Sequence, residues 1–333
     1  MNAKRRQGRA LCAALALMGL VLVSMPAAAA TLAVAPGQSL GEALRRAADG
    51  DVIELAAGDY RGEVGVIEQK RLTLRGVLGD VGGRAVLHAA GRHAEGKAIL
   101  VVRHGEVQIE NIEFRGSRVP DGNGAGIRFE RGRLTVLNCV FHDNQKGILT
   151  SNAADAELVV RDSVFGQAPR GAQLPHLLYV GSIARFTLSG SRFSGGAHGH
   201  LVKSRARVSE VRDNQLVDGP GGQAAYELEF PNGGDVTVVG NTIGQSASTT
   251  NPVLISYGVE GYVAGPHSLV LKNNTLVNGA SRAAVFVRVR EAAPPARLRV
   301  VDNRLYGPGD PGAALPAQGN LQLPLSALPV SER

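Results

Sequence analysis

The chain has 333 residues, with 36 lysine and arginine side chains against 29 aspartate and glutamate side chains, and a formal net charge of +7. Four of the basic residues lie in segment 1–30, so removing them from +7 leaves +3. That charge is too small to favour a nucleic-acid partner, because nucleic-acid-binding domains concentrate basic side chains on one face. Cys139 is the one cysteine outside segment 1–30, so stability has to come from a hydrophobic core and not from a disulfide within the rest of the chain.

Segment 1–30 has the pattern of a signal peptide. It begins with Lys4, Arg5, Arg6 and Arg9, continues with the apolar run Leu11–Val23, and ends in small residues. The run of about 13 residues is too short to cross the hydrocarbon core of a bilayer as a helix, and no later segment is longer or more apolar. We therefore expect an exported protein, periplasmic or secreted, without a membrane span.

The next predicted element is an amphipathic helix over residues 39–49. Ser39 and Glu42 have the spacing of a capping box, apolar residues follow on one face, and Gly50 supplies a stop.

From residue 107 onward the chain repeats one pattern eight times. Each unit is an alternating apolar run, a polar bend and a single apolar anchor. The anchors are Phe114, Phe141, Phe165, Phe193, Leu216, Ile243, Leu276 and Leu305, at intervals of 23 to 33 residues. Alternation with period two indicates strands, and a repeat of this length indicates stacked units that cannot bury their apolar faces alone. The pattern predicts an all-β fold, a right-handed parallel β-helix solenoid.

Asparagines recur in the bends of this repeat, and helix 39–49 acquires a role from it. Asparagine tolerates left-handed backbone and can hydrogen-bond from coil to coil. The bends contain Asn138, Asn214, Asn241, Asn274 and Asn303. An open stack of parallel strands exposes unpaired backbone at its ends, so we expect helix 39–49 to be an N-terminal capping helix.

The last predicted segment is the proline-rich tail 308–333, whose prolines exclude a central strand. We expect this tail to cover the last coil or to hang free. The predicted domains are a signal peptide over 1–30, a β-helix domain over 31–307 and the C-terminal tail over 308–333.

Stacking of the coils predicts a row of polar side chains on one outer face. PHLLYVGS (175–182) and GHLVKSRA (199–206) align without a gap, so His200 should stack on His176, and Lys203 should point outward beside Tyr179. The same parity, applied to neighbouring coils, predicts an outward row of Arg128, Tyr179, Lys203, Arg205, Glu227 and Glu229.

This row has two interpretations. As an ion-pair ladder, Lys203 opposite Glu229 would contribute at most about 1 kcal/mol and keep the sheet soluble. As a groove for an acidic polysaccharide, Arg205 would pair with a uronate carboxylate, Lys203 would remove the proton at C5, and His200 or Tyr226 would protonate the leaving oxygen. The candidate substrate-binding residues are Arg128, Tyr179, His198, Glu227, Glu229 and Tyr257.

Metal binding is the third question that the row raises. Glu227 and Glu229 are tentative ligands for Ca²⁺, which prefers carboxylate oxygens, or they orient Arg205 instead. A zinc site at His198 and His200 is disfavoured against a stack of His200 on His176, because no third ligand lies close in sequence. No other cofactor is predicted.

Three irregular loops are expected to form the walls of the groove. They span 117–126, 166–175 and 244–268, and insertions in repeat proteins gather on a binding face. The chain has no tryptophan, so large aromatic platforms for neutral sugars are poorly supplied, and a charged glycan fits the residues better.

The opening stretch APGQSLGEALRRAADGDVIELAAGDYRG (35–62) resembles that of many exported proteins of the pectin-lyase-like β-helix superfamily, in which a cap helix precedes a first strand that ends in Gly-x-Tyr. The resemblance implies the fold and a range of functions: pectate and alginate lyases, polygalacturonases, polyuronate epimerases and non-enzymatic proteins. The paired aspartates of polygalacturonases and the Asp-Pro-His-Asp motif of alginate epimerases are absent from the sequence.

We therefore expect a monomeric, exported, carbohydrate-active protein that cleaves a uronic-acid-containing polysaccharide by β-elimination, as a polysaccharide lyase, or epimerises it. The alternative is a non-catalytic envelope protein that binds a glycan or a protein through the same sheet face. A third possibility is a hydrolase of neutral glycans that uses Glu227 and Glu229 as paired carboxylates.

Overall fold

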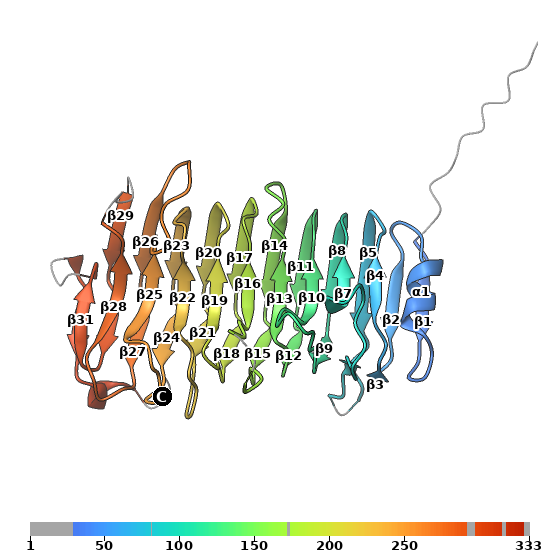
Figure 1. The fold of residues 1–333 in the computed structure, drawn as a ribbon, viewed down its shortest axis with the longest axis horizontal. Helices are drawn as coiled ribbons and strands as arrows, with labels where there is room; N and C mark the ends of the chain where they lie inside the picture. The colour runs from blue at the N-terminus through green and yellow to red at the C-terminus, as the bar shows by residue number, and fades with distance from the viewer. Residues whose placement is uncertain (1–28, 81, 172–173, 292–296, 315–317, 330–333) are drawn as a thin grey trace, which may run out of the picture.

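Parallel strands stack along one axis into an elongated solenoid (Figure 1). The computed structural model describes residues 29–80, 82–171, 174–291, 297–314 and 318–329. Within these ranges each full coil contributes one strand to each of three parallel sheets, A, B and C, and the neighbours in a sheet come from successive coils. The predicted right-handed parallel β-helix is therefore confirmed.

The bounds of the elements follow this order. Sheet A has 11 strands: β1 (Thr31–Val34), β2 (Val52–Leu55), β5 (Arg71–Gly76), β8 (Glu106–Glu110), β11 (Arg133–Leu137), β14 (Glu157–Arg161), β17 (Arg185–Ser189), β20 (Val208–Arg212), β23 (Asp235–Val239), β26 (Ser268–Lys272) and β29 (Arg297–Val301). Sheet B has 11 strands: β3 (Gly58–Arg61), β6 (Ala85–His88), β9 (Ile112–Arg115), β12 (Val140–His142), β15 (Val164–Gly166), β18 (Arg192–Ser194), β21 (Gln215–Val217), β24 (Thr242–Gln245), β27 (Thr275–Asn278), β30 (Arg304–Tyr306) and β32 (Leu321–Leu323). Sheet C has 10 strands: β4 (Gly65–Ile67), β7 (Ala98–Val102), β10 (Ala125–Phe129), β13 (Lys146–Thr150), β16 (Leu178–Val180), β19 (His200–Ser204), β22 (Tyr226–Phe230), β25 (Val253–Tyr257), β28 (Ala284–Val289) and β31 (Gly309–Gly312).

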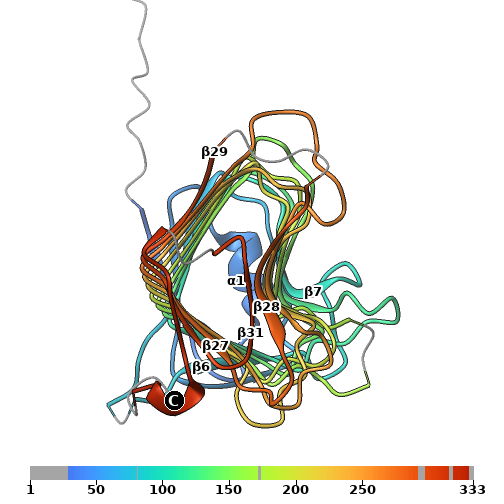
Figure 2. The same cartoon turned by 90° about the vertical axis from the view of Figure 1, so that its left-hand side faces the viewer.

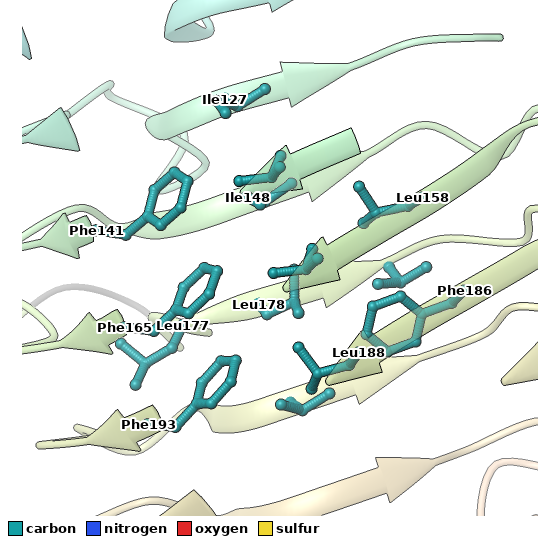
Figure 3. Close-up of a cluster of buried hydrophobic side chains, with 14 of the residues drawn as sticks. Ile127, Phe141, Ile148, Leu158, Phe165, Leu177, Leu178, Phe186, Leu188 and Phe193 are labelled. Carbon is teal, nitrogen blue, oxygen red and sulfur yellow. The ribbon is translucent and has the colours of Figure 1, made fainter. Parts of the chain in front are cut away.

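The apolar anchors of the repeat form columns inside the solenoid. Phe114, Phe141, Phe165 and Phe193 stack with ring centroids 5.1, 4.6 and 4.4 Å apart, and all four are buried. Figure 3 shows the last three of these rings on successive strands, with leucines of sheet C beside them. This stacking is the one that the spacing of the anchors predicts.

A ladder of side chains joins the coils at the corner between sheets A and B. In each step a backbone N–H donates to a side-chain oxygen of the next coil: Cys139 to Ser163, Ser163 to Ser191, Ser191 to Asn214, Asn214 to Asn241, Asn241 to Asn274, Asn274 to Asn303 and Asn303 to Asn320. The predicted coil-to-coil role of the bend asparagines is confirmed for these positions. The left-handed residue is the preceding one, as at Asp213 and Asn273, with φ of +56° and +55°.

An α-helix, α1 (Leu40–Arg46), lies at the N-terminal end of the solenoid (Figure 1). Ser39 caps it by accepting a hydrogen bond from the Glu42 amide at 3.3 Å, and Leu40 and Leu44 are buried in the core. Viewed along the solenoid, α1 falls within the outline of the coils (Figure 2). The helix exists where we expected one, and its capping role stays a prediction.

The two ends of the chain differ in what the structure describes. Most of the predicted signal peptide, residues 1–28, lies outside the described residues, and within those ranges no helix is long and apolar enough to cross a membrane. At the other end, strand pairing continues beyond the predicted boundary at residue 307. Strands β31 and β32 pair with β28 and β30 at the edges of their sheets, and a short 3₁₀ helix, η2 (Leu325–Ala327), follows. Pro311 lies in the edge strand β31, where proline removes no ladder bond from a neighbour.

We predict that Asn241→Ala lowers the free energy of unfolding by about 2 kcal/mol, measured by urea denaturation. Asn241 is 1% exposed, and its amide group bonds to Asn214, Asn274 and two carbonyl groups, which the alanine would leave without partners. The exposed Asn123→Ala is the control and should change the value by less than about 0.5 kcal/mol. Equal effects of the two substitutions would contradict a stabilising role for the ladder.

Candidate functional site

A column of side chains on the outer face of sheet C contains most of the predicted site. The strand register aligns Arg128, Leu149, Tyr179, Lys203, Glu229, Ser256 and Arg288 on successive coils. The outward positions predicted for Arg128, Tyr179, Lys203 and Glu229 are therefore correct. Their alignment follows from parallel pairing, which sets equivalent residues of neighbouring strands about 4.8 Å apart.

Lys203 is held between two carboxylates. Its Nζ lies 3.1 Å from Glu229 Oε2 and 2.8 Å from Glu260 Oε1, and 5.8 Å from the ring centre of Tyr179. Lys203 is only 8% exposed and Glu229 only 3%, so this ion pair is largely shielded from water. The predicted pairing of Lys203 with Glu229 is confirmed, and Glu260 is an additional partner.

Arg205 has a hydrogen-bond partner at each nitrogen of its guanidinium group. Nε donates to the Tyr179 hydroxyl at 3.0 Å, Nη2 donates to Glu260 Oε2 at 2.7 Å, and Nη1 donates to Asn232 Oδ1. These contacts fix the plane of the guanidinium group and bring the tyrosine hydroxyl to it. We call Tyr179, Lys203, Arg205, Glu229 and Glu260 the charged cluster.

Two histidines lie beside the cluster at the corner where the sheet C strands begin. The rings of His176 and His200 stack with centroids 4.6 Å apart, and the His200 amide donates to His176 Nδ1 at 2.9 Å. This is the predicted corner stack, and Tyr226 follows with its ring 5.1 Å from that of His200. Burial, helped by the charges of Lys203 and Arg205, lowers the pKa of His200 to about 3. Burial likewise lowers the pKa of His176 well below its usual value, so both rings are neutral near pH 7.

Lys146 is a residue of this corner that the sequence interpretation missed. It opens strand β13 and is 3% exposed, and its Nζ donates to the Leu174 carbonyl at 2.6 Å. Burial lowers its pKa to about 8. Aligning KGILT (146–150) with HLLYV (176–180) would have placed Lys146 in the same column as His176.

Glu260 and Asn232 were also missed, and no alignment of repeats could have found them. Both lie in loops, 57 and 27 residues from the cluster residues that they contact, Lys203 and Arg205. Of the other predicted contact residues, Arg128 pairs with Glu130 at 3.1 Å. His198 is exposed in the turn before β19 with φ of +60°, so its substrate contact stays a prediction.

The prediction that Tyr257 binds substrate is wrong. Tyr257 is the last residue of β25, where its register partner is Phe230, and it is fully buried in the core. Its hydroxyl donates to the Gly234 carbonyl at 2.6 Å, inside the solenoid wall. The expected loop 244–268 contains this strand, and within it Tyr257 takes an inward position.

The outward position predicted for Glu227 is also wrong. At the start of the sheet C strands two consecutive residues face the core: a Cβ added at Gly126 or Gly147 would lie within 3 Å of a core phenylalanine ring, and the aligned Leu201 is buried in the core. Glu227 follows Leu201 in this inner column and is 1% exposed. Burial, with the nearby Asp218 adding to it, raises the pKa of Glu227 well above its usual value.

Glu227 and Glu229 therefore lie on opposite sides of β22. They cannot share a Ca²⁺ ion, and they cannot flank one glycosidic bond as a pair of hydrolytic carboxylates. Within the described residues no group of three or more histidine, cysteine or carboxylate side chains has a geometry that could hold a metal ion. The tentative calcium site and the hydrolase alternative are both withdrawn.

Hollows on either side of the charged cluster make room for a ligand. One, of about 420 Å³, is lined by Lys97, Asp121, Arg128, Asn152 and Tyr179, with part of loop 117–126 as a wall, as predicted. The other, of about 210 Å³, is lined by Arg205, Asn232 and the loop from Val263 to His267. Tyr179 and Arg205 separate the two hollows and are hydrogen-bonded to each other.

Comparison with known proteins gives matches among solved structures. No protein-family model and no curated protein matches the chain. An alginate lyase from Paenibacillus sp. str. FPU-7 superposes with a TM-score of 0.54 and 18% identity, over 88% of this chain and 97% of that one. A PL6 family alginate lyase (TM-score 0.42, 17% identity, 91% and 38% covered) and the Dettilon tailspike protein (0.38, 12%, 89% and 60%) also match. The chain thus has the pectate-lyase-like parallel β-helix fold.

We predict that Glu227→Gln changes how stability depends on pH. A raised pKa in the folded state favours folding fully below the unfolded value of about 4.3, and this contribution is lost as the pH rises toward the folded value. Glutamine removes the titration, so the melting temperature of the variant relative to the wild type should increase between pH 5 and pH 8.

The exposed Glu68→Gln is the control, and its difference from the wild type should not change with pH. A difference for Glu227→Gln that stays constant or decreases over this range would show that Glu227 is ionised in the folded protein.

Proposed function

We propose that this protein is an exported, monomeric enzyme that binds an acidic polysaccharide along sheet C and removes the C5 proton of a uronate residue. The outcome is chain cleavage by β-elimination or epimerisation at C5. The observation that carries the proposal is the charged cluster itself, in which an ammonium group, a guanidinium group and a phenol meet between two hollows.

The chemistry assigns a role to each group. The guanidinium of Arg205 pairs with the uronate carboxylate and neutralises it, which makes the adjacent C5 proton more acidic. Lys203, as the free amine, takes that proton. In β-elimination the electron pair forms the C4–C5 double bond, the C4–O bond breaks, and a donor protonates the leaving oxygen. In epimerisation a proton returns to C5 from the opposite face.

The proton donor is better sought at Tyr179 than at His200. With a pKa of about 3, His200 is not an imidazolium near neutral pH and cannot serve as a cationic acid there. The Tyr179 hydroxyl lies in the cluster and accepts a hydrogen bond from Arg205, which favours a phenol poised to give up its proton. Tyr226, beyond His200, is the second candidate for this role.

The sugar chain has a path along the outer face beyond the cluster. Lys97 and Arg128 line the larger hollow and share Glu130, with Lys97 Nζ 3.0 Å and Arg128 Nε 3.1 Å from its carboxylate. These cations supply contacts for further acidic residues of the polymer. Similarity to an alginate lyase supports a uronate polymer as the class of substrate.

A non-catalytic glycan-binding protein is the second candidate. It is favoured by the ion pairs themselves, because Lys203 and Arg205 already have carboxylate partners and would contribute to a ladder without any ligand. Binding of a uronate polymer with no ultraviolet-absorbing unsaturated product and no epimerised residues would favour this candidate.

We predict that Lys203→Arg lowers the turnover of a uronate polymer by about 10²-fold or more. Arginine keeps the positive charge beside Glu229 and Glu260, yet it stays protonated near neutral pH and cannot act as the base. Turnover is measured by the absorbance of the unsaturated product and by NMR of the C5 configuration. Unfolding in urea checks that the variant is folded.

Arg185→Lys, in the exposed ion pair with Glu210 on sheet A, is the matched control and should keep full turnover. A fully active Lys203→Arg enzyme would exclude lysine as the base, and the same assay on Tyr179→Phe would then test the phenol.

A further inference from the structure

The loop that follows β25 brings a carboxylate back to the charged cluster. Glu260 contacts Lys203 Nζ with Oε1 at 2.8 Å and Arg205 Nη2 with Oε2 at 2.7 Å. One carboxylate thus bridges the two cations, each through a different oxygen. A free carboxylate ligand has the same two oxygens at the same separation, so it can make the same pair of contacts.

Glu260 differs from the other charged residues of the cluster in its access to water. Its side chain is 43% exposed, whereas those of Lys203 and Arg205 are 9% and 19% exposed. A carboxylate at this exposure regains water at little cost when it leaves, whereas a buried charge that loses its partner is penalised strongly. If the bridge opens, the two cations stay in place and need another anion.

Glu260 also sits on a loop that has few anchors near it. Its amide donates to the Pro231 carbonyl at 2.9 Å, and the Tyr262 hydroxyl donates to the Arg290 carbonyl at 2.8 Å. Glycines with φ of +77° and +102° stand at positions 258 and 261 on either side of it. The same loop continues along the smaller hollow beside Arg205.

We propose that Lys203 and Arg205 form a subsite for the carboxylate of an anionic sugar, and that Glu260 occupies this subsite as an internal competitor until the ligand displaces it. The inference rests on the proposed function, because it takes the same cluster as the place where a uronate binds. It makes Glu260 a specificity-determining residue: a neutral sugar has no carboxylate to exchange, so the bridge stays closed.

The competition has a measurable cost in affinity. The apparent affinity for a carboxylate is reduced by the fraction of molecules in which Glu260 has left the subsite. If the bridge is closed in about nine molecules of ten, the ligand binds about tenfold more weakly than to a protein without the competitor. Although burial raises it, hydrogen bonds from Lys203 and Arg205 lower the pKa of Glu260, so it is a charged competitor near neutral pH.

The first test is the affinity of Glu260→Gln for glucuronate, measured by titration calorimetry on the full chain. Glutamine keeps the shape but not the charge, so the variant should bind glucuronate about tenfold more tightly than the wild type. The control Glu210→Gln removes a carboxylate of similar exposure from an ion pair with Arg185 on sheet A and should bind like the wild type. The uncharged methyl ester of glucuronic acid should gain no affinity from Glu260→Gln.

The second test is hydrogen exchange of the amides of residues 258–262, which needs no ligand. Exchange should be faster in Glu260→Gln than in the wild type, and glucuronate should accelerate it in the wild type. Glu260→Asp, whose shorter side chain retains the charge, should fall between the two. Unchanged exchange in all three proteins would overturn the inference, because the loop would then be held independently of the bridge.

The outcomes separate this inference from the proposed function. Tighter binding by Glu260→Gln, including binding that only the variant shows, supports both. Wild-type binding that Glu260→Gln leaves unchanged or weakens overturns the competitor role and leaves the proposed function standing. Absence of glucuronate binding and of uronate-polymer binding in both proteins overturns both.

Discussion

The structure depends on hydrogen bonds that each coil makes to the next at the corner between sheets A and B. The bend residue of one coil gives its amide hydrogen to a side-chain oxygen one coil further on, without interruption from Cys139 to Asn320. Because these groups are buried, a slip of one residue would leave several donors without acceptors, at about 1–3 kcal/mol each. The corner therefore sets the register of the coils. That register aligns the phenylalanine rings inside and Tyr179, Lys203 and Glu229 outside.

How far the sequence predicts this molecule follows from where the strands are regular. Repeat length and period-two alternation are local consequences of strand geometry, so the fold and the pairing of Tyr179 with Lys203 could be inferred without a structure. Parity fails at the start of the sheet C strands, where the chain turns a corner and two neighbouring residues face the core. Leu201 hides this turn because it is apolar, whereas Glu227 obeys the same geometry although it is a carboxylate. Tyr257 was misplaced for another reason, because an insertion beside it concealed the strand that it ends.

Contacts made by loops are the part of the site that repetition does not encode. Glu260 reaches Lys203 across 57 residues of sequence, and Asn232 reaches Arg205 across 27. Their positions depend on the path of irregular backbone, which no periodic pattern specifies. Lys146 is an intermediate case, since its column is set by the repeat but its burial comes from segment 166–175 before β16, whose Leu174 carbonyl accepts from its amine.

The burial of the charged cluster bears on whether the outer face of sheet C is a ladder or a site. Exposed pairs such as Arg131 with Asp155, whose side chains are 65% and 62% exposed, are enough to keep a solenoid soluble. Lys203 and Glu229 are less than 10% exposed, and removing two charges from water costs several kcal/mol per ion before their attraction offsets it. Apolar residues in that column, like Leu149 two coils away, would avoid this cost. A buried ammonium–carboxylate pair next to an oriented guanidinium is thus a poor device for stability. The same desolvation strengthens every electrostatic contact with a bound anion, which is what a site for a uronate requires.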